Sequence, residues 1–311
     1  MIQDTASRVR DNIKRVIVGK DDAIDLMIIA ALCEGHALLE DVPGTGKTTL
    51  AKAMAISLGC SFRRIQFTPD LLPSDVTGIN FFNQKTQEFE FRPGPILSQV
   101  LLADEINRAT PRTQSALLEA MQERQMTIDG TTYPLPRPFL VMATQNPIEL
   151  EGTFPLPEAQ LDRFLLRVAI GYPTEDEENA ILTRFRTEDP LDSLQPVTDP
   201  PSVMEMIRQT RQVHVAEAVQ NYIVTIARHT RRSEEIDLGA SPRATMALYR
   251  TAQARAAIYG RDFALPDDAK YLAPHVLTHR IQISPHTRLR GRRPEDVISD
   301  LVNTIPVPVE R

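Results

Sequence analysis

The sequence predicts a doubly wound α/β domain with inserted β-hairpins, followed by a smaller, all-helical domain. Short apolar runs alternate with helical or irregular stretches over the first part of the chain, as in a buried parallel sheet. A proline-rich stretch at 189–201 then disfavours helix, and only helical patterns follow it. We therefore place one domain at 1–189 and a second at 190–311, because 311 residues exceed the usual size of one core.

The first domain begins with a helix, a strand, a glycine-containing loop and a second helix. Apolar residues recur on one face of a predicted helix at 22–32, and another helix follows the loop at 43–46 and ends before Gly59. Short apolar runs indicate buried strands at 37–39, 62–67, 100–103 and 139–143. The glycine-containing loop therefore connects a strand to a helix.

Two segments that interrupt this alternation are predicted to be β-hairpins. The first spans 77–91 and has Phe89 and Phe91 alternating with polar residues after a polar turn. The second lies around Asp129-Gly130, a strong signal for a two-residue hairpin turn. Hairpins inserted in this way are candidate contacts for a substrate.

Capping residues indicate where later helices begin. Thr174 and Ser202 are each followed by a glutamate three residues further on, which is the spacing of a capping box. Ser241-Pro242 is expected to start another helix, because serine caps helices and proline is tolerated in the first turn. The second domain is therefore read as a helical bundle.

Composition and charge narrow the classes of function. Hydrophobic residues make up 42% of the chain and charged residues 24%, which is ordinary for a globular protein. No apolar stretch approaches the roughly 20 residues of a membrane helix, and the N-terminus lacks signal-peptide features, so we expect a cytoplasmic protein without membrane insertion. The formal net charge of -6 argues against an obligatory duplex-binding surface. Cys33 and Cys60 lack metal-site spacing and are expected to be buried thiols.

The loop after the first predicted strand has the residue types that a nucleoside triphosphate requires. Its backbone N–H groups can surround the phosphates, Lys47 can bridge the outer phosphates, and the Thr48 hydroxyl can bind Mg²⁺. The full pattern has a glycine where this chain has Asp41, so the loop alone also fits a flexible turn that caps a helix. The residues predicted to bind ATP here are Pro43, Gly44, Thr45, Gly46, Lys47, Thr48 and Thr49.

An acidic pair follows the apolar strand at 100–103. Asp104 and Glu105 come at the C-terminal end of that strand, the edge of an α/β sheet where ligands bind. Asp104 is a candidate for holding Mg²⁺ through its water shell, and Glu105 for activating the attacking water, as in a Walker B motif. An exposed acidic helix start is the alternative, but the preceding strand and the phosphate loop argue against it.

A polar amide is predicted to lie beside the acidic pair. Asn146 follows the strand at 139–143, whose C-terminal end should lie at the same edge of the sheet. It is expected to hold the γ-phosphate or the attacking water. By itself, Asn146-Pro147 is an ordinary turn sequence, and only its position favours a functional role.

With these residues assembled, the chain resembles the MoxR family of AAA+ ATPases. The resemblance covers almost the whole chain and is carried by 40–48, 104–109, 161–164 and the ending 305–309. Aspartate at position 41 is shared by many MoxR-like sequences, so it does not count against the phosphate loop. The family also resembles the magnesium-chelatase motor subunit and carries hairpins at the two inserted positions.

The resemblance implies roles for two arginines. Arg163 corresponds to the arginine finger that reaches the neighbouring subunit's ATP site, with Arg167 as the alternative. Arg243 corresponds to sensor 2 at the start of a lid helix, acting on its own or on the neighbouring site. From charge spacing alone, Arg163 could instead form a local ion pair with Asp162.

The resemblance also implies an assembly and a partner. Asn146 corresponds to sensor 1, and Val18 and Gly19 are implied to lie near adenine. ATP would bind between the subunits of a homo-oligomeric ring, which the resemblance implies is a hexamer. The client would be another protein, with a partner that carries a von Willebrand factor A domain, and the process would be maturation or metal insertion.

Two other functions fit parts of the sequence. A nucleic-acid motor is the second hypothesis, because related AAA+ helicases carry similar hairpins and the run from Arg288 to Arg293 could contact phosphates. Net acidity and few aromatic residues count against it. A non-hydrolysing scaffold would use nucleotide only for assembly. The presence of Lys47, Asp104 and Glu105 argues against a scaffold.

Overall fold

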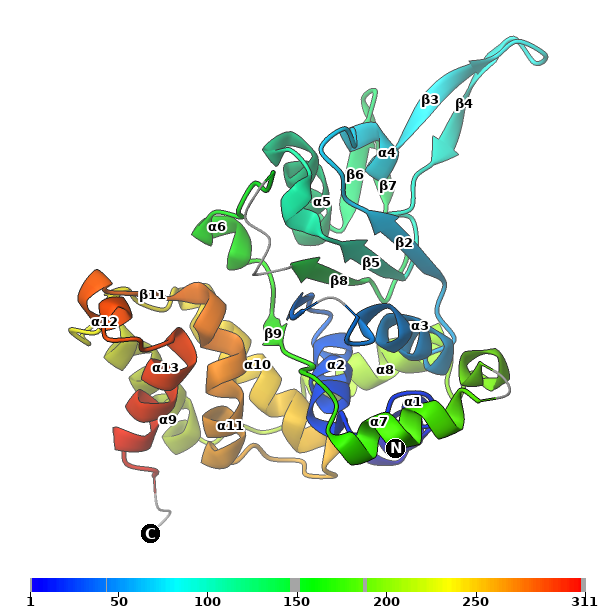
Figure 1. Ribbon diagram of the computed structural model, residues 1–311. Coiled ribbons are helices and arrows are strands. Elements are labelled where there is room, and N and C mark those ends of the chain that lie inside the picture. Colours follow the sequence, from blue (N-terminus) through cyan, green and yellow to red (C-terminus); the bar gives the residue numbers. More distant parts are fainter. Residues whose placement is uncertain (1, 43, 146–151, 187–188, 309–311) are drawn as a thin grey trace.

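A parallel sheet forms the centre of the α/β part in the computed structural model, which describes residues 2–42, 44–145, 152–186 and 189–308 (Figure 1). Its five strands run parallel in the order β2-β5-β8-β1-β9. They are β1 (Ala37–Glu40), β2 (Phe62–Gln66), β5 (Val100–Asp104), β8 (Leu140–Gln145) and β9 (Leu166–Val168). The predicted doubly wound α/β fold is confirmed.

The sheet separates two hydrophobic cores, because successive side chains of a strand point to opposite faces. Ala37 and Leu39 of β1 pack in the first core, whereas Leu38 packs in the second. Helices α1 (Ile2–Lys14), α2 (Asp21–Leu32) and α3 (Lys47–Ser57) contribute to the first core, and α4 (Pro73–Thr77) and α5 (Pro111–Glu123) to the second. Both faces of the sheet are therefore covered, as a parallel sheet requires.

The C-terminal helices, called the lid below, share the first core. They are α8 (Pro200–Thr210), α9 (Glu217–Thr230), α10 (Pro242–Ile258), α11 (Pro266–Leu277), α12 (Pro285–Leu289) and α13 (Pro294–Thr304). Helix α2 packs against α1, α8, α10 and β9, and its residues 23–32 are all buried. The hydroxyl of Tyr259, at the end of α10, donates to Asp25 at 2.9 Å. The helical lid is confirmed, and one hydrophobic core crosses the predicted boundary at 189/190. Within the described ranges, no helix combines the length and apolar character needed to cross a membrane.

Both predicted hairpins are present. β3 (Gly78–Asn83) pairs with β4 (Glu88–Pro93), and β6 (Gln125–Ile128) pairs with β7 (Thr131–Pro134). The β3-β4 hairpin projects away from the rest of the molecule (Figure 1). The rings of Phe91 and Tyr133 stack with centroids 4.3 Å apart, so the two hairpins contact each other.

Strand β9 and a small pair of strands in the lid were not predicted. β9 has only three residues with Arg167 at its centre, so it lacks the apolar run that indicated the other strands. The lid contains the antiparallel pair β10 (Ile236–Leu238) and β11 (Gln282–Ile283). Strands this short are fixed by tertiary contacts rather than by their own sequence.

The predicted helix starts have different outcomes. Thr174 caps α7 (Glu175–Arg184) with the expected capping box, and Ser241 caps α10. The capping box at Ser202 was wrong, because α8 begins at Pro200 and the Asp199 carboxylate accepts from the Ser202 N–H at 2.7 Å. Prolines are tolerated at the start of this helix because the N–H groups of the first turn have no acceptor within the helix.

His36 directly precedes β1 and is buried. Its Nδ1 accepts from the Val141 N–H at 3.0 Å, so its Nε2 carries the proton and donates to the Met121 carbonyl, 3.2 Å away. Burial lowers the pKa of His36 to about 4. The imidazole is therefore neutral in the folded protein near pH 7.

This neutral imidazole predicts acid sensitivity. An unfolded histidine titrates near pH 6.5, so between about pH 6.5 and 4 the unfolded chain binds the extra proton and stability is lost as the pH falls. For His36 the expected loss between pH 7 and pH 5 is about 2 kcal/mol. In urea titrations, His36→Gln should show a shallower pH dependence, whereas exposed His286→Gln should not. Equal slopes for all three proteins would contradict this prediction.

Candidate functional site

The phosphate loop connects β1 to α3 and is shaped by two glycines. Gly44 and Gly46 have φ angles of 84° and 89°, the left-handed region that glycine adopts without strain. Gly46 is the N-cap of α3, so the free N–H groups of that helix face the loop. A helix N-terminus of this kind binds phosphate. Pro43, also predicted here, lies outside the described residues.

The predicted phosphate and metal ligands line one cavity of about 370 Å³. The Lys47 ammonium lies at the loop and donates to the carbonyls of Asp41 at 2.6 Å and Val42 at 3.1 Å. Burial lowers the pKa of Lys47, although nearby carboxylates act in the opposite direction. The cavity is lined by Gly44, Gly46, Lys47, Thr48, Thr49, Arg64, Asp104, Glu105, Thr144 and Gln145.

Asp41, which replaces the first glycine of the general pattern, binds the loop to the chain after β9. Its Oδ2 accepts from the Ile170 N–H at 2.8 Å and also from the Gly171 N–H. Its Oδ1 accepts from the Val42 N–H at 2.8 Å. The aspartate therefore fixes the start of the phosphate loop, a contact that sequence spacing did not reveal.

The acidic pair is positioned by Thr144 of β8, the strand between β1 and β5. The Thr144 hydroxyl donates to Asp104 Oδ1 at 2.6 Å and accepts from the Glu105 N–H at 2.8 Å. The other oxygen of Asp104 accepts from Arg64 Nη2 at 2.6 Å. Glu105 has a φ of 55°, a left-handed conformation that is uncommon outside glycine and often found at functional sites.

The Glu105 carboxylate is bound by two side chains that were not predicted. Gln66 Nε2 donates to Oε2 at 2.7 Å, and Arg108 Nη1 lies 3.1 Å from the same oxygen. Gln66 ends β2 and pairs in register with Asp104, so the strand order was the signal that could have located it. The candidate base therefore has two hydrogen-bond donors on one oxygen.

Oxygen ligands suited to Mg²⁺ meet in this cavity. The Thr48 hydroxyl and the Asp104 carboxylate both line it, together with the helix N-terminus that would face phosphates. Magnesium prefers one or two protein oxygens, with water and phosphate oxygens completing its shell, and this donor set fits that preference. Asn146, the predicted sensor 1, lies outside the described residues, directly after the end of β8.

A second, more apolar cavity of about 180 Å³ adjoins the phosphate loop and suits a purine base. Val18 lines it, as the resemblance implied, and Gly44, Gly46 and Thr49 line both cavities. Gly19 is not among its lining residues and lies against the Glu177 carboxylate. Thr45, also predicted, lines it too, and the lining residues that were not predicted are Val16, Ile17, Lys20, Pro173, Ile181 and Phe185.

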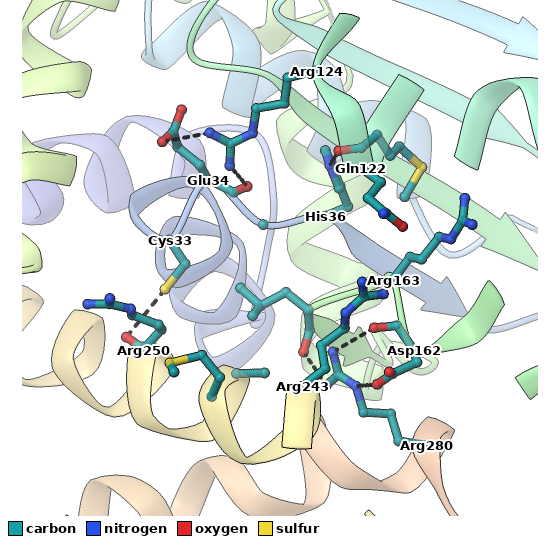
Figure 2. A pocket seen from close by; sticks show the side chains of 15 residues that line it. Cys33, Glu34, His36, Gln122, Arg124, Asp162, Arg163, Arg243, Arg250 and Arg280 are labelled. Atoms are coloured by element: carbon teal, nitrogen blue, oxygen red, sulfur yellow. Dashed lines mark hydrogen bonds and ion pairs between the residues drawn. The ribbon is translucent and has the colours of Figure 1, made fainter. Parts of the chain in front are cut away.

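Arg163 and Arg243 lie together in a third cavity, of about 320 Å³ (Figure 2). Neither arginine lines the phosphate cavity. Asp162 does not pair with Arg163: it accepts from the Ser241 hydroxyl at 3.1 Å and from Arg280 Nε at 2.8 Å. Because Ser241 caps α10, this contact places Arg243 near Arg163.

Arg280, from the lid, holds the turn that carries Arg163. Its side chain is only 2% exposed, and burial lowers its pKa to about 10. The guanidinium also donates to the carbonyls of Phe164 at 2.6 Å and Leu165 at 3.0 Å. A buried cation requires such partners, so these bonds fix the turn to the lid.

Arg167, the alternative finger, is bound within its own chain. Its Nε lies 2.5 Å from Glu40 Oε2, and its Nη1 also pairs with Glu295 of α13. These contacts connect the residue before the phosphate loop to the lid. Of the two candidates, Arg163 is therefore the better placed to contact a neighbouring molecule.

The fold and the site together define the nucleotide-binding core of an AAA ATPase. Residues 36–166 match the family described as the ATPase family associated with various cellular activities, and residues 228–301 match the AAA lid domain. The chain belongs to the MoxR family of AAA ATPases.

This assignment agrees with relatives that align with this chain over most of both lengths. The Mycobacterium tuberculosis protein named Chaperone MoxR1 is 41% identical, over 98% of this chain and 82% of its own length. The uncharacterized protein YeaC of Bacillus subtilis is 49% identical, over 97% of this chain and 94% of its own. The crystal structure of a Cytophaga hutchinsonii protein assigned as an ATPase superposes with a TM-score of 0.92 at 38% identity, covering 99% of this chain and 96% of that one.

The Asp41 contacts predict that restoring the general loop pattern weakens nucleotide binding. Asp41→Gly removes a charged acceptor of three backbone N–H groups, and losing even one such bond typically costs about 1.5–3 kcal/mol. A tenfold or greater rise in the Kd of a fluorescent ATP analogue is expected, by roughly 1.4 kcal/mol per tenfold. The Kd of Asp41→Asn, which keeps an acceptor, should lie between those of the unmodified protein and Asp41→Gly. Unchanged affinity for Asp41→Gly would refute the anchoring role.

Proposed function

We propose that this protein hydrolyses ATP with Mg²⁺ in the cavity at the end of β1. The observation that carries the proposal is the convergence of Lys47, Thr48, Asp104 and Glu105 in one cavity. Lys47 would neutralise the outer phosphates, and Thr48 and Asp104 would hold Mg²⁺, which supplies charge neutralisation when bound. Glu105 would orient and deprotonate the attacking water after leaving Gln66 and Arg108.

The proposed active site is completed by a second copy of the chain. Arg163 and Arg243 lie in a cavity separate from the phosphate cavity, so they are suited to contact the nucleotide of a neighbour. An arginine supplied in this way stabilises transition-state charge and is typically worth 10³–10⁵ in rate. We infer a homo-oligomeric ring, as a hexamer, with sensor 2 acting in trans like the finger.

The proposed client is another protein, contacted by the two hairpins. The β3-β4 hairpin projects from the core and exposes Phe81, Phe82 and Phe89, with Phe89 75% exposed. Exposed aromatic side chains on a projecting element favour contact with a partner. The name of the M. tuberculosis relative supports a chaperone-like role. We extend this to maturation, or metal or cofactor insertion, with a partner carrying a von Willebrand factor A domain.

A nucleic-acid motor is disfavoured because acidic side chains pair with part of the basic run at 288–293. Arg292 pairs with Asp300, and Arg293 pairs with Asp296, so half of the four arginines at 288–293 have acidic partners. A nucleic-acid surface needs unpaired cations for phosphates. ATP turnover that rises with added DNA and falls steeply with salt would favour the motor; turnover independent of DNA favours a protein remodeller.

The Glu105→Gln variant tests the catalytic assignment. Without its base the enzyme should lose about 10²–10⁴-fold in turnover. Binding of an ATP analogue should persist, because Lys47 and the helix N-terminus are intact. Phosphate release and nucleotide binding are measured on the same preparation. If the unmodified protein shows no Mg²⁺-dependent turnover in any assembly state, the ATPase proposal fails and the non-hydrolysing scaffold is favoured.

Mixing two inactive variants tests the shared site. Arg163→Ala subunits keep Glu105, and Glu105→Gln subunits keep Arg163, so some mixed interfaces contain both groups. Activity should return on mixing if Arg163 acts in trans. Arg167→Ala serves as the comparison, because its partners Glu40 and Glu295 lie in its own chain. No recovery in a mixture that forms mixed rings would contradict the trans assignment.

A further inference from the structure

Glu34, which follows the C-cap residue of α2, has a carboxylate that is almost fully buried among three arginines. Its side chain is 1% exposed, and Arg137 donates to Oε1 from Nε at 2.9 Å and from Nη2 at 2.6 Å. Arg124 Nη1 lies 3.0 Å from Oε2, and Arg211 Nη2 donates to Oε2 at 3.1 Å. These four residues are called the Glu34 cluster below.

Two members of the Glu34 cluster flank the β6-β7 hairpin. Arg124 ends α5 and immediately precedes β6, whereas Arg137 follows β7. The Leu135 N–H donates to the Arg124 carbonyl at 3.0 Å and closes the base of the hairpin. One buried carboxylate therefore binds a residue on each side of the hairpin.

The cluster also reaches the cavity that holds Arg163 and Arg243. Glu34 and Arg124 line that cavity, as Figure 2 shows for both side chains. Arg211 ends α8, and its carbonyl accepts from Gln253 of α10 at 3.3 Å. Since α10 begins with the segment that carries Arg243, contacts run from that arginine's helix to the base of the hairpin.

Stability alone does not explain a buried ionic cluster at this junction. Replacing such clusters by apolar side chains is often neutral or stabilising, because desolvating the charges offsets their attraction. The paired bonds from one guanidinium to a carboxylate, however, fix its orientation as well as its position. The cluster is therefore suited to transmitting a change of angle between the elements it joins.

We propose that the Glu34 cluster is a positioning device that couples the neighbour-facing cavity to the β6-β7 hairpin. It rests on the proposed function, in which Arg163 and Arg243 contact a neighbour's nucleotide and the hairpins contact a client. A displacement of α10 or Arg124 when the neighbour holds ATP moves both hairpin ends together. The Phe91–Tyr133 stack passes the movement to the β3-β4 hairpin.

A single fluorescent reporter can follow the hairpin, because the chain contains no tryptophan. Tyr133→Trp places the probe on β7, and Glu105→Gln keeps ATP bound, so emission is compared between the ATP and ADP states. Arg211→Ala then removes one arm of the cluster while Arg124 and Arg137 still pair with Glu34. Arg208→Ala is the matched control, since it lies on the same helix and pairs with Glu205 instead.

The expected result is loss of the response without loss of the fold. In Arg211→Ala, the emission difference between the ATP and ADP states should fall to roughly a third or less of its value in the reference protein, in line with typical coupling changes. It should recover in part in Arg211→Lys. Arg208→Ala should behave as the reference, and all variants should keep ATP affinity and melting temperature. An Arg211→Ala response equal to that of Arg208→Ala overturns the inference, as does a reference protein without any emission difference.

Hydrolysis measured in parallel separates the two proposals. The assay uses Arg211→Ala and Arg208→Ala with Glu105 intact. If both hydrolyse ATP normally while the hairpin response is unaffected, the coupling inference fails and the ATPase proposal stands. Absence of hydrolysis in the unmodified protein overturns both.

Discussion

The carboxylate of Asp162 is the contact on which the arrangement of the proposed shared site depends. It accepts from Ser241, which caps α10, and from Arg280, which is buried in the lid. The turn that presents Arg163 and the helix that presents Arg243 are thus bound to one side chain. The cost of burying Arg280 is offset by its bonds to backbone carbonyls, so the turn and the lid stabilise each other.

In the phosphate cavity, hydrogen bonds restrain the candidate base, Glu105. Its backbone is left-handed, and the N–H donates to the Thr144 hydroxyl. Its carboxylate is bound by Gln66 and Arg108. In this arrangement the carboxylate cannot accept a proton from water with the same oxygen until a donor leaves. The two donors on Oε2 therefore fix the orientation of the candidate base.

The sequence was sufficient where function requires particular residue types in a row. The predicted residues that share one cavity are Lys47, Thr48, Asp104 and Glu105. They could be predicted because each follows closely after a strand, and the C-terminal ends of parallel strands meet at one edge of the sheet. Residues that act through distant contacts escaped prediction: Asp41 binds beyond β9, and Arg280 binds a turn more than a hundred positions earlier. Short elements such as β9, and helix starts where proline and aspartate compete with serine, were also set by contacts that periodicity does not encode.

The hydrophobic core that crosses from α1–α3 into the lid has a consequence for how the chain is made. The apolar surface of α2, complete by residue 32, is covered in part by α10, which begins at Pro242. During synthesis the N-terminal part emerges first, so the part of this surface that α10 covers has no partner until more than two hundred further residues have been made. The core shared by the two parts is therefore complete only after the lid has been synthesised.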